Sequence, residues 1–223
     1  MSMNVFVLCD SHWHPGRIVE DGTAAIADRG FRFDYSDGAS PGALDALSAY
    51  PVAILSKSNT RTESDREKWI DEGKAAALSS FVEGGGGLVA VHSGIAGYRE
   101  STTVRGLLGG LFLRHPEQCP VAFQVTAAHP VTEGVGSFEL LDEHYWIDAL
   151  DPSVEVLAKT SGGVVDQPGC WVARRGEGRV CVITPGHNLE VWLNSNFQRL
   201  LRNALLWCAR VDPESGGGRG AAT

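Results

Sequence analysis

Apolar residues gather in short runs along the first ninety residues, and the length of these runs predicts strands. Residues 5–8, 52–55 and 88–91 are continuous apolar runs, as expected for strands that are buried on both faces of a sheet. Residues 31–35 alternate between apolar and polar positions, which is typical of a strand with one buried face. This part of the chain therefore predicts four strands.

Helical patterns lie between these strands. Residues 17–29 and 41–50 predict two helices. The strongest helical pattern covers residues 64–83, where Ser64 and Glu67 have the spacing of a capping box. Because strands and helices alternate along the chain, the pattern favours a mainly parallel sheet with helices on both faces, which is a three-layer α/β sandwich.

The second half of the chain has a different pattern of apolar and polar residues. Short strands with tight turns between them are predicted at residues 119–127, 137–141, 153–159, 170–174 and 179–184. These strands are expected to add antiparallel pairs to the edge of the sheet, and residues 190–210 are expected to close the domain as one amphipathic helix. We expect a single α/β domain over residues 1–211 and a disordered glycine-rich tail over residues 212–223.

Composition and charge exclude several classes of protein. The 223 residues have a formal net charge of −8, so a surface that follows nucleic-acid phosphates is not expected. No stretch approaches the roughly 20 apolar residues of a membrane helix, and the first residues lack the features of a leader peptide. The five cysteines are widely spaced and odd in number, which is typical of free thiols in a reducing compartment. A cytoplasmic location follows by elimination.

Polar residues gather where the predicted parallel strands end. In an open parallel sheet, ligands bind outside the carboxyl ends of the strands. The residues at those ends that carry useful chemistry are Asp10, Ser11, His12, His14, Lys57, Asn59, His92, Ser93, His187 and Asn188. Four of the seven histidines of the chain are in this set, which indicates a site at one rim of the sheet.

His92 has the most informative surroundings. It follows the buried strand at residues 88–91, and Ala90 and Gly94 flank it at two residues on either side. Small residues at these positions permit the sharp turn that exposes one side chain above a sheet, as in a nucleophile elbow. His92 is therefore expected either to face a ligand as an acid, base or metal ligand, or merely to cap the turn.

Several segments in the same order resemble the trehalose-utilisation (ThuA-like) family. These segments are His92-Ser93, His129-Pro130-Val131-Thr132-Glu133-Gly134, Asp142-Glu143-His144-Tyr145, Gly178-Arg179-Val180 and Thr184-Pro185-Gly186-His187-Asn188. The resemblance covers roughly residues 4–210. It implies the flavodoxin-like fold of class I glutamine amidotransferases, with His92 in the place of the amidotransferase cysteine.

The resemblance also implies a role in carbohydrate metabolism, on a keto-disaccharide or related glycoside. His92, His187 and Glu143 are the expected catalytic groups, and the reaction classes left open are lyase, hydrolase and isomerase. The expected substrate-binding residues are Asp10, His12, Ser93, Tyr145 and Asn188. A carbohydrate ligand is the expected partner, without nucleic acid or membrane, and a homodimer is a further candidate.

A divalent metal such as zinc is the sharpest hypothesis for the histidines. His12, His14, His92 and His187 are the candidate ligands, because zinc binds three or four nitrogen, sulfur or oxygen donors. The alternatives are a non-catalytic sugar-binding or regulatory domain on the same fold, and an interaction module. A functional glutamine amidotransferase is not expected, because no thiol stands at the turn.

Overall fold

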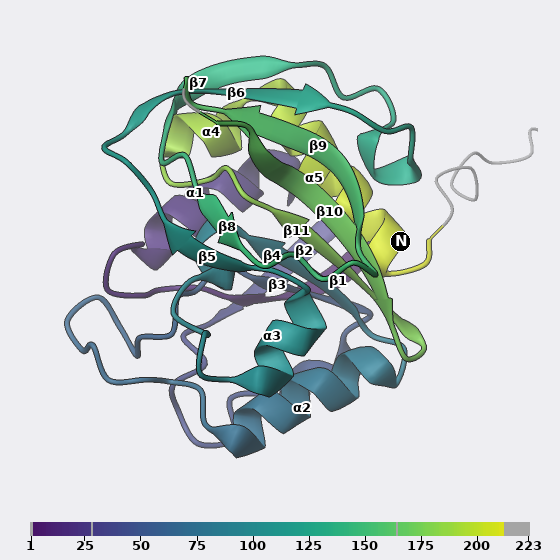
Figure 1. Cartoon of the computed structure of the whole chain (residues 1–223). Coiled ribbons are helices and arrows are strands. Elements are labelled where there is room, and N and C mark those ends of the chain that lie inside the picture. Colours follow the sequence, from purple (N-terminus) through teal and green to yellow (C-terminus); the bar gives the residue numbers. More distant parts are fainter. Residues whose placement is uncertain (1, 28, 164, 212–223) are drawn as a thin grey trace, which may run out of the picture.

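The computed structural model describes residues 2–27, 29–163 and 165–211. Within these residues the main element is a nine-stranded sheet in the order β2-β1-β3-β4-β11-β10-β9-β6-β7 (Figure 1). The parallel half consists of β2 (Phe31–Ser36), β1 (Met3–Leu8), β3 (Val52–Leu55), β4 (Gly87–Val91) and β11 (Gly178–Ile183). The predicted strands of the first half and their parallel arrangement are confirmed.

The other half of the sheet is antiparallel. It consists of β10 (Gln167–Arg175), β9 (Glu155–Ser161), β6 (Cys119–Val125) and β7 (Phe138–Asp142). This confirms the expected antiparallel addition. A separate two-stranded sheet pairs β5 (Leu111–Arg114) with β8 (Trp146–Asp148), and this pair was not predicted.

Helices cover both faces of the sheet, so the protein is a mixed α/β structure. One face is covered by α1 (Gly16–Ala27), α4 (Leu189–Leu193) and α5 (Ser195–Cys208), and the other by α2 (Glu72–Glu83) and α3 (Thr102–Leu108) (Figure 1). Alternate residues of β1 serve the two cores: Val5 and Val7 face the first, and Phe6 and Leu8 face the second. Across the described ranges, no helix has the length and apolar character needed to span a bilayer.

The helix predicted at residues 64–83 begins eight residues later than expected, so the proposed capping box of Ser64 and Glu67 was wrong. The cap is Asp71, whose carboxylate accepts a hydrogen bond from the backbone N–H of Lys74 at 2.8 Å. Trp69, which lies within the predicted range, is buried from the preceding loop instead, where its indole N–H donates to the hydroxyl of Tyr98. Burial of an aromatic ring therefore does not require a helix at this position.

Two other helices differ from expectation. Residues 41–44 form a turn, and only Asp45–Ala49 is helical, as the 3₁₀ helix η1. The single helix predicted at residues 190–210 is divided at Asn194, because the Asn194 side chain accepts hydrogen bonds from the amides of Asn196 and Phe197 and so starts α5. The expected tail at 212–223 lies outside the described residues.

Candidate metal centre

The pairing of β4 with β11 brings the first two site segments together. Ile183 is level with Val91 in this parallel pair, so the next residues, Thr184 and His92, emerge side by side at the carboxyl end of the sheet. His92 starts the 3₁₀ helix η2 (His92–Ile95) and has a left-handed backbone with φ of +45°. A residue other than glycine pays roughly 1–2 kcal/mol for this conformation. The sharp turn thus presents the imidazole above the sheet.

Gly94 makes this turn possible. A Cβ atom at Gly94 would lie only 1.9 Å from the carbonyl oxygen of Leu55 on the neighbouring strand β3. The turn therefore packs directly against the end of β3, and no side chain fits between them. The small residue seen in the sequence at this position has a steric cause.

The imidazole of His92 has a defined orientation. Its Nδ1 lies 2.8 Å from the carbonyl oxygen of Thr184. A carbonyl only accepts hydrogen bonds, so Nδ1 carries the proton, and in the neutral ring Nε2 then has a free lone pair. That Nε2 lies 3.2 Å from Oε2 of Glu143, and the side chain of His92 is only 1% exposed. Two electron-rich atoms therefore face each other, an arrangement that a proton or a shared cation stabilises.

His14 reaches the same place from the loop after β1. The backbone N–H and C=O of Ser11 and His14 pair with each other at 3.0 and 3.1 Å, which closes a tight turn. The buried amine of Lys57 donates to the carbonyl of Asp10 and holds the start of this loop. Neither ring nitrogen of His14 hydrogen-bonds to another described residue, although its side chain is only 11% exposed.

His187 follows β11 after a Pro-Gly turn, and Asp142 fixes that turn. The Asp142 carboxylate, which is buried at the end of β7, accepts hydrogen bonds from the backbone amides of Gly186, His187 and Glu143 at 2.8–3.0 Å. One carboxylate thus ties the antiparallel half of the sheet to the loop of the parallel half. It positions the backbone of two site residues at once.

Glu143 stands at the centre of the cluster. Its oxygens lie 3.2 Å from Nε2 of His92, 3.2 Å from Nδ1 of His187 and 3.9 Å from Nε2 of His14. The ring centroids of the three histidines are 5.0, 5.1 and 5.5 Å apart, so the imidazoles form a nearly regular triangle. One potential ligand atom from each of the four residues lies within 4.8 Å of the others.

The environment sets the protonation of the cluster. Burial lowers the pKa of His14 to about 4, with the neighbouring imidazoles acting in the same direction and Glu143 opposing them. Burial alone raises the pKa of Glu143, but His14, His187 and His92 outweigh it and hold that pKa well below its usual range. Burial also lowers the pKa of His187, but Glu143 raises that pKa by more, so the net shift is upward. At neutral pH the cluster therefore offers a carboxylate and a neutral His14.

These donors fit a divalent cation. Three imidazole nitrogens and one carboxylate oxygen are donor types that zinc uses in proteins. Ligands at about 2.0–2.2 Å in a tetrahedron stand about 3.3 Å from one another, so the widest separation of 4.8 Å would close by more than 1 Å around an ion. His92 also has the outer hydrogen bond to a carbonyl that orients metal-binding histidines. The chemistry and the burial of the donor set agree with a metal centre.

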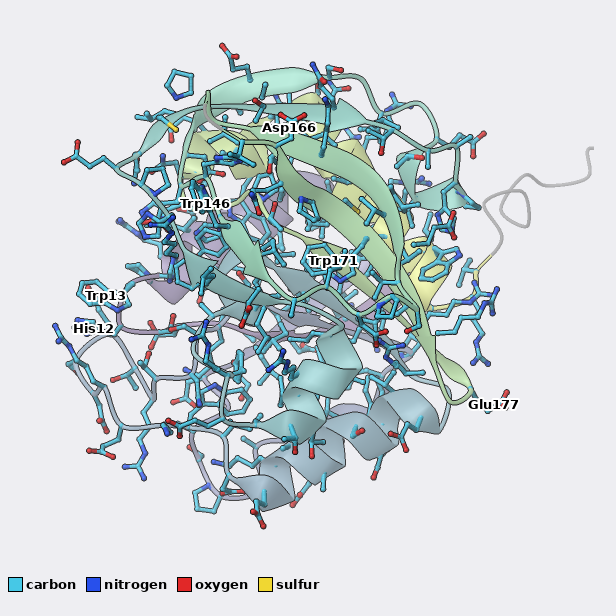
Figure 2. The ribbon with its side chains drawn as sticks, in the orientation of Figure 1. His12, Trp13, Trp146, Asp166, Trp171 and Glu177 are labelled. Atoms are coloured by element: carbon cyan, nitrogen blue, oxygen red, sulfur yellow. The ribbon has the colours of Figure 1, made fainter. Side chains whose placement is uncertain are left out.

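His12, a predicted metal ligand and substrate-binding residue, lies outside this cluster. Its Nε2 accepts a hydrogen bond from Nε of Arg66 at 2.9 Å, and its Nδ1 contacts the carbonyl of Glu63. Figure 2 shows His12 and Trp13 together at one edge of the molecule. Because His14 turns inward and His12 turns towards the loop of residues 60–66, only one of the two histidines joins the site.

The other predicted residues occupy different environments. Asp10 accepts a hydrogen bond from the N–H of Gly16, so its carboxylate helps to start α1. Tyr145 is buried and stacks on His92 with ring centroids 4.0 Å apart, which makes it a support for the imidazole rather than an open platform. Asn188 donates to the carbonyl of Leu141. Ser93 is buried beside His92, and its hydroxyl has no partner among the described residues.

His115, which no sequence pattern singled out, also contacts Glu143. Its Nε2 lies 3.5 Å from Oε1 of Glu143, and its side chain is 34% exposed. The pairing of β5 with β8 brings it there, because His115 follows β5 directly and its ring stacks against Tyr145. The sequence signal that could have identified it is a histidine directly after a short, partly apolar strand. Its ring is more exposed than the imidazoles of His14, His92 and His187.

Solved structures share the fold. The chain matches a ThuA-like protein from Bacteroides uniformis ATCC 8492 with a TM-score of 0.70 and 23% identity, over 93% of this chain and 91% of that one. It matches a ThuA-like protein from Parabacteroides merdae ATCC 43184 with a TM-score of 0.74 and 14% identity, over 94% and 90%. A β-galactosidase from Rahnella sp. R3 matches with a TM-score of 0.64 and 15% identity, over 95% of this chain but 32% of that one.

Sequence comparison identifies the family. No curated protein matches the chain. The model of the ThuA family, described as trehalose utilisation, matches residues 12–208. This range includes all four residues of the cluster and His115. The chain belongs to the ThuA family.

Proposed function

We propose that His14, His92, Glu143 and His187 bind a divalent metal ion such as zinc and that this centre acts on a carbohydrate. The observation that carries the proposal is the convergence of three imidazoles and one carboxylate within 4.8 Å, in a largely buried position. Structural histidines usually find hydrogen-bond partners in the protein. The ring nitrogens of His14 have none among the described residues, which supports a ligand role.

The proposed substrate is a keto-disaccharide or related glycoside. Membership of the ThuA family suggests a role in trehalose utilisation. Trp13, beside His14 in the chain, is 63% exposed, and an exposed indole ring offers an apolar face to a sugar. A metal at the centre would act as a Lewis acid on a carbonyl or hydroxyl oxygen of the substrate.

His115 is the proposed proton-transfer group. Its side chain is 34% exposed, more than that of any other histidine in contact with Glu143, whereas His92 is almost fully buried. A half-exposed imidazole can exchange protons with both solvent and a substrate near neutral pH. Lyases, hydrolases and isomerases of sugars all need such a group, and the reaction class within these three stays open.

The strand order supports a relation to a known fold. The parallel strands follow the order 2-1-3-4-5 when numbered along the chain, which is the flavodoxin-like order, and we propose that relation together with the likeness to glutamine amidotransferases. A thiol-dependent amidotransfer is not part of the proposal. His92 stands at the turn, and burial raises the pKa of the Cys9 thiol, which follows β1, to about 12 and so disfavours the reactive thiolate.

Metal analysis of the purified full chain tests the metal centre. We expect about one zinc or manganese ion per chain in the wild type, and loss of the ion in His92→Ala and His14→Ala. His12→Ala is the matched control, because His12 lies two residues from His14 and outside the cluster. Equal metal content in all four proteins, or no metal in the folded wild type, would contradict the proposed metal centre.

A non-catalytic sugar-binding domain is the second candidate function, and the exposed Trp13 is the observation that favours it. Turnover and binding of a keto-disaccharide should be measured separately. Loss of turnover in His115→Gln with unchanged binding supports the enzyme. Binding by the metal-loaded wild type without turnover supports the binding domain.

A further inference from the structure

A cavity lies at the opposite end of the parallel strands from the histidine cluster. It has a volume of about 860 Å³ and is bounded by α5, the start of β11 and the loop around η3 (Pro130–Thr132). Arg179 is the second residue of β11, whereas His187 follows the other end of the same strand. Because a six-residue strand is roughly 20 Å long, the two places are separate.

One face of α5 forms a wall of the cavity. Arg199, Arg202 and Leu206 are spaced by three or four residues and so project on the same side of the helix. Arg210 lines the cavity from the turn after α5, where its backbone is left-handed with φ of +59°. The opposite side of α5 is buried in the core through residues such as Leu200 and Leu205. The sequence of this helix therefore presents the guanidinium groups of Arg199 and Arg202 on its solvent side.

Three of the guanidinium groups that line the cavity have no partner within the described residues. Among the described residues, the side chains of Arg199, Arg202 and Arg210 make no hydrogen bond or ion pair, and Glu133 is the acidic residue that lines the cavity. Such a cluster is unusual in a chain with a net charge of −8, because guanidinium groups repel one another unless an anion lies between them. The local charge points to an anionic ligand.

The cavity also has a fixed aromatic wall. Arg179 donates from Nη1 to the carbonyl of Trp207 at 2.9 Å and lies 5.0 Å above its ring. On another side, the ring of His129 contacts Trp207 edge-on at 5.0 Å. Trp207 is thereby held in place, and its half-buried indole can pack against a ring of the ligand.

The loop opposite α5 is shaped to bring Arg199 close. Gly134 has a φ of +65°, and a Cβ there would lie 2.9 Å from Nη1 of Arg199. Asn203 donates to the carbonyl of Glu133 at 3.0 Å and holds this loop against the helix. The wall of the cavity is therefore positioned by specific contacts.

We propose that this cavity binds a small phosphate-bearing metabolite with a sugar or base ring. Three guanidinium groups around one space match a group with two or more negative charges, since guanidinium binds phosphate oxygens through paired hydrogen bonds. Trp207 and Leu206 provide the apolar contact for the ring. The strongly negative net charge disfavours a long polyanion such as nucleic acid.

Isothermal titration of the full chain with three probes tests the proposal: pyrophosphate, glucose 6-phosphate and ADP. We expect one site per chain with a dissociation constant below about 1 mM at low salt, and at least tenfold weaker binding in Arg199→Ala and Arg202→Ala. Arg32→Ala, on the exposed part of the edge strand β2, should bind like the wild type. The preferred probe distinguishes a sugar phosphate from a nucleotide.

Two results would overturn the proposal. The first is absence of saturable binding by all three probes, or equal weakening in Arg32→Ala, which would indicate general surface charge. The second concerns Asp212 and Glu214, which follow the helix in the sequence. If probes bind only when both are replaced by Asn and Gln, the chain's own carboxylates are the occupant and no metabolite site exists.

Discussion

The carboxylate of Asp142 accepts a hydrogen bond from the backbone N–H of His187 at 3.0 Å. The two residues belong to different halves of the sheet, since Asp142 ends β7 and His187 follows β11. The same carboxylate accepts from Gly186 and Glu143. It therefore sets the distance between the carboxylate of Glu143 and the imidazole of His187 without touching either side chain.

Replacing Asp142 with Asn should damage both stability and the site. The amide group puts an N–H₂ against a backbone donor, so the free energy of unfolding should fall by about 2 kcal/mol. Metal affinity should fall by about 10–100-fold, as for other residues that orient metal ligands. Urea unfolding and zinc titration measure the two effects. Asp166→Asn, at an exposed side chain, should change stability by less than about 0.5 kcal/mol, and an equal loss there would contradict the positioning role.

Glu143→Gln should separate the charge of the cluster from its shape. Glutamine has nearly the same size as glutamate but no negative charge, so zinc affinity should fall by at least about tenfold while the fold is kept. Competition with a chelator gives the affinity, and circular dichroism checks the fold. Glu139→Gln, on the exposed side of β7, should bind zinc like the wild type. Unchanged affinity in Glu143→Gln would exclude the carboxylate from the ligand set.

His115→Gln should lower turnover and leave the metal in place. Its imidazole lies beside Glu143 but outside the triangle of the other three imidazoles, and removing a general acid or base costs about 10²–10⁴-fold in rate. Steady-state kinetics on a keto-disaccharide, together with metal analysis of the same sample, check both parts. Loss of the metal would make His115 a ligand instead.

Lys57 predicts a specific dependence of stability on pH. Burial lowers the pKa of its amine from 10.5 to about 8. Between these values the unfolded chain holds more protons than the folded one, so the free energy of unfolding contributed by Lys57 rises with pH, by up to about 3 kcal/mol. Below pH 8 this contribution is constant. Urea unfolding of the wild type and Lys57→Met from pH 7 to 10.5 should show a steeper rise for the wild type, and parallel curves would contradict the shift.

Two glycines should respond to alanine in opposite ways. Gly94→Ala would place a Cβ 1.9 Å from the carbonyl oxygen of Leu55, so unfolding free energy should fall by more than about 3 kcal/mol. Gly106 lies in α3 with open space around it, so Gly106→Ala should gain about 0.5–1 kcal/mol from helix propensity. Thermal and urea unfolding of both variants measure the difference. A stable Gly94→Ala protein would show that the turn at His92 can move.

The sequence was sufficient for elements whose pattern is local. The apolar runs at residues 5–8, 52–55 and 88–91 became central parallel strands, because two-sided burial requires continuous apolar residues. The helix start at 64 was wrong because Trp69 is apolar and buried without being helical. A periodic pattern cannot distinguish a packed loop from a helix when tertiary contacts bury the same residues.

The site was predictable only in part for a similar reason. His14, His92 and His187 were placed at one rim by the rule that parallel strands end together, and the structure brings them together. His12 could not be told from His14, because the turn between Ser11 and His14 and the contact with Arg66 decide which ring points inward. His115 depends on the pairing of β5 with β8, a contact between distant segments that no local pattern encodes.

The origin of Glu143 has a mechanical consequence. The three imidazoles come from segments that follow parallel strands, while the carboxylate of Glu143 directly follows β7 at the far edge of the antiparallel half. A sliding motion of one half against the other by about 1 Å would change every distance to the carboxylate, and shifts of that size can cost about 100-fold in rate. The pairing of β10 with β11, which joins the two halves, therefore determines how precisely Glu143 stands against the three imidazoles, even though no proposed ligand lies within either strand.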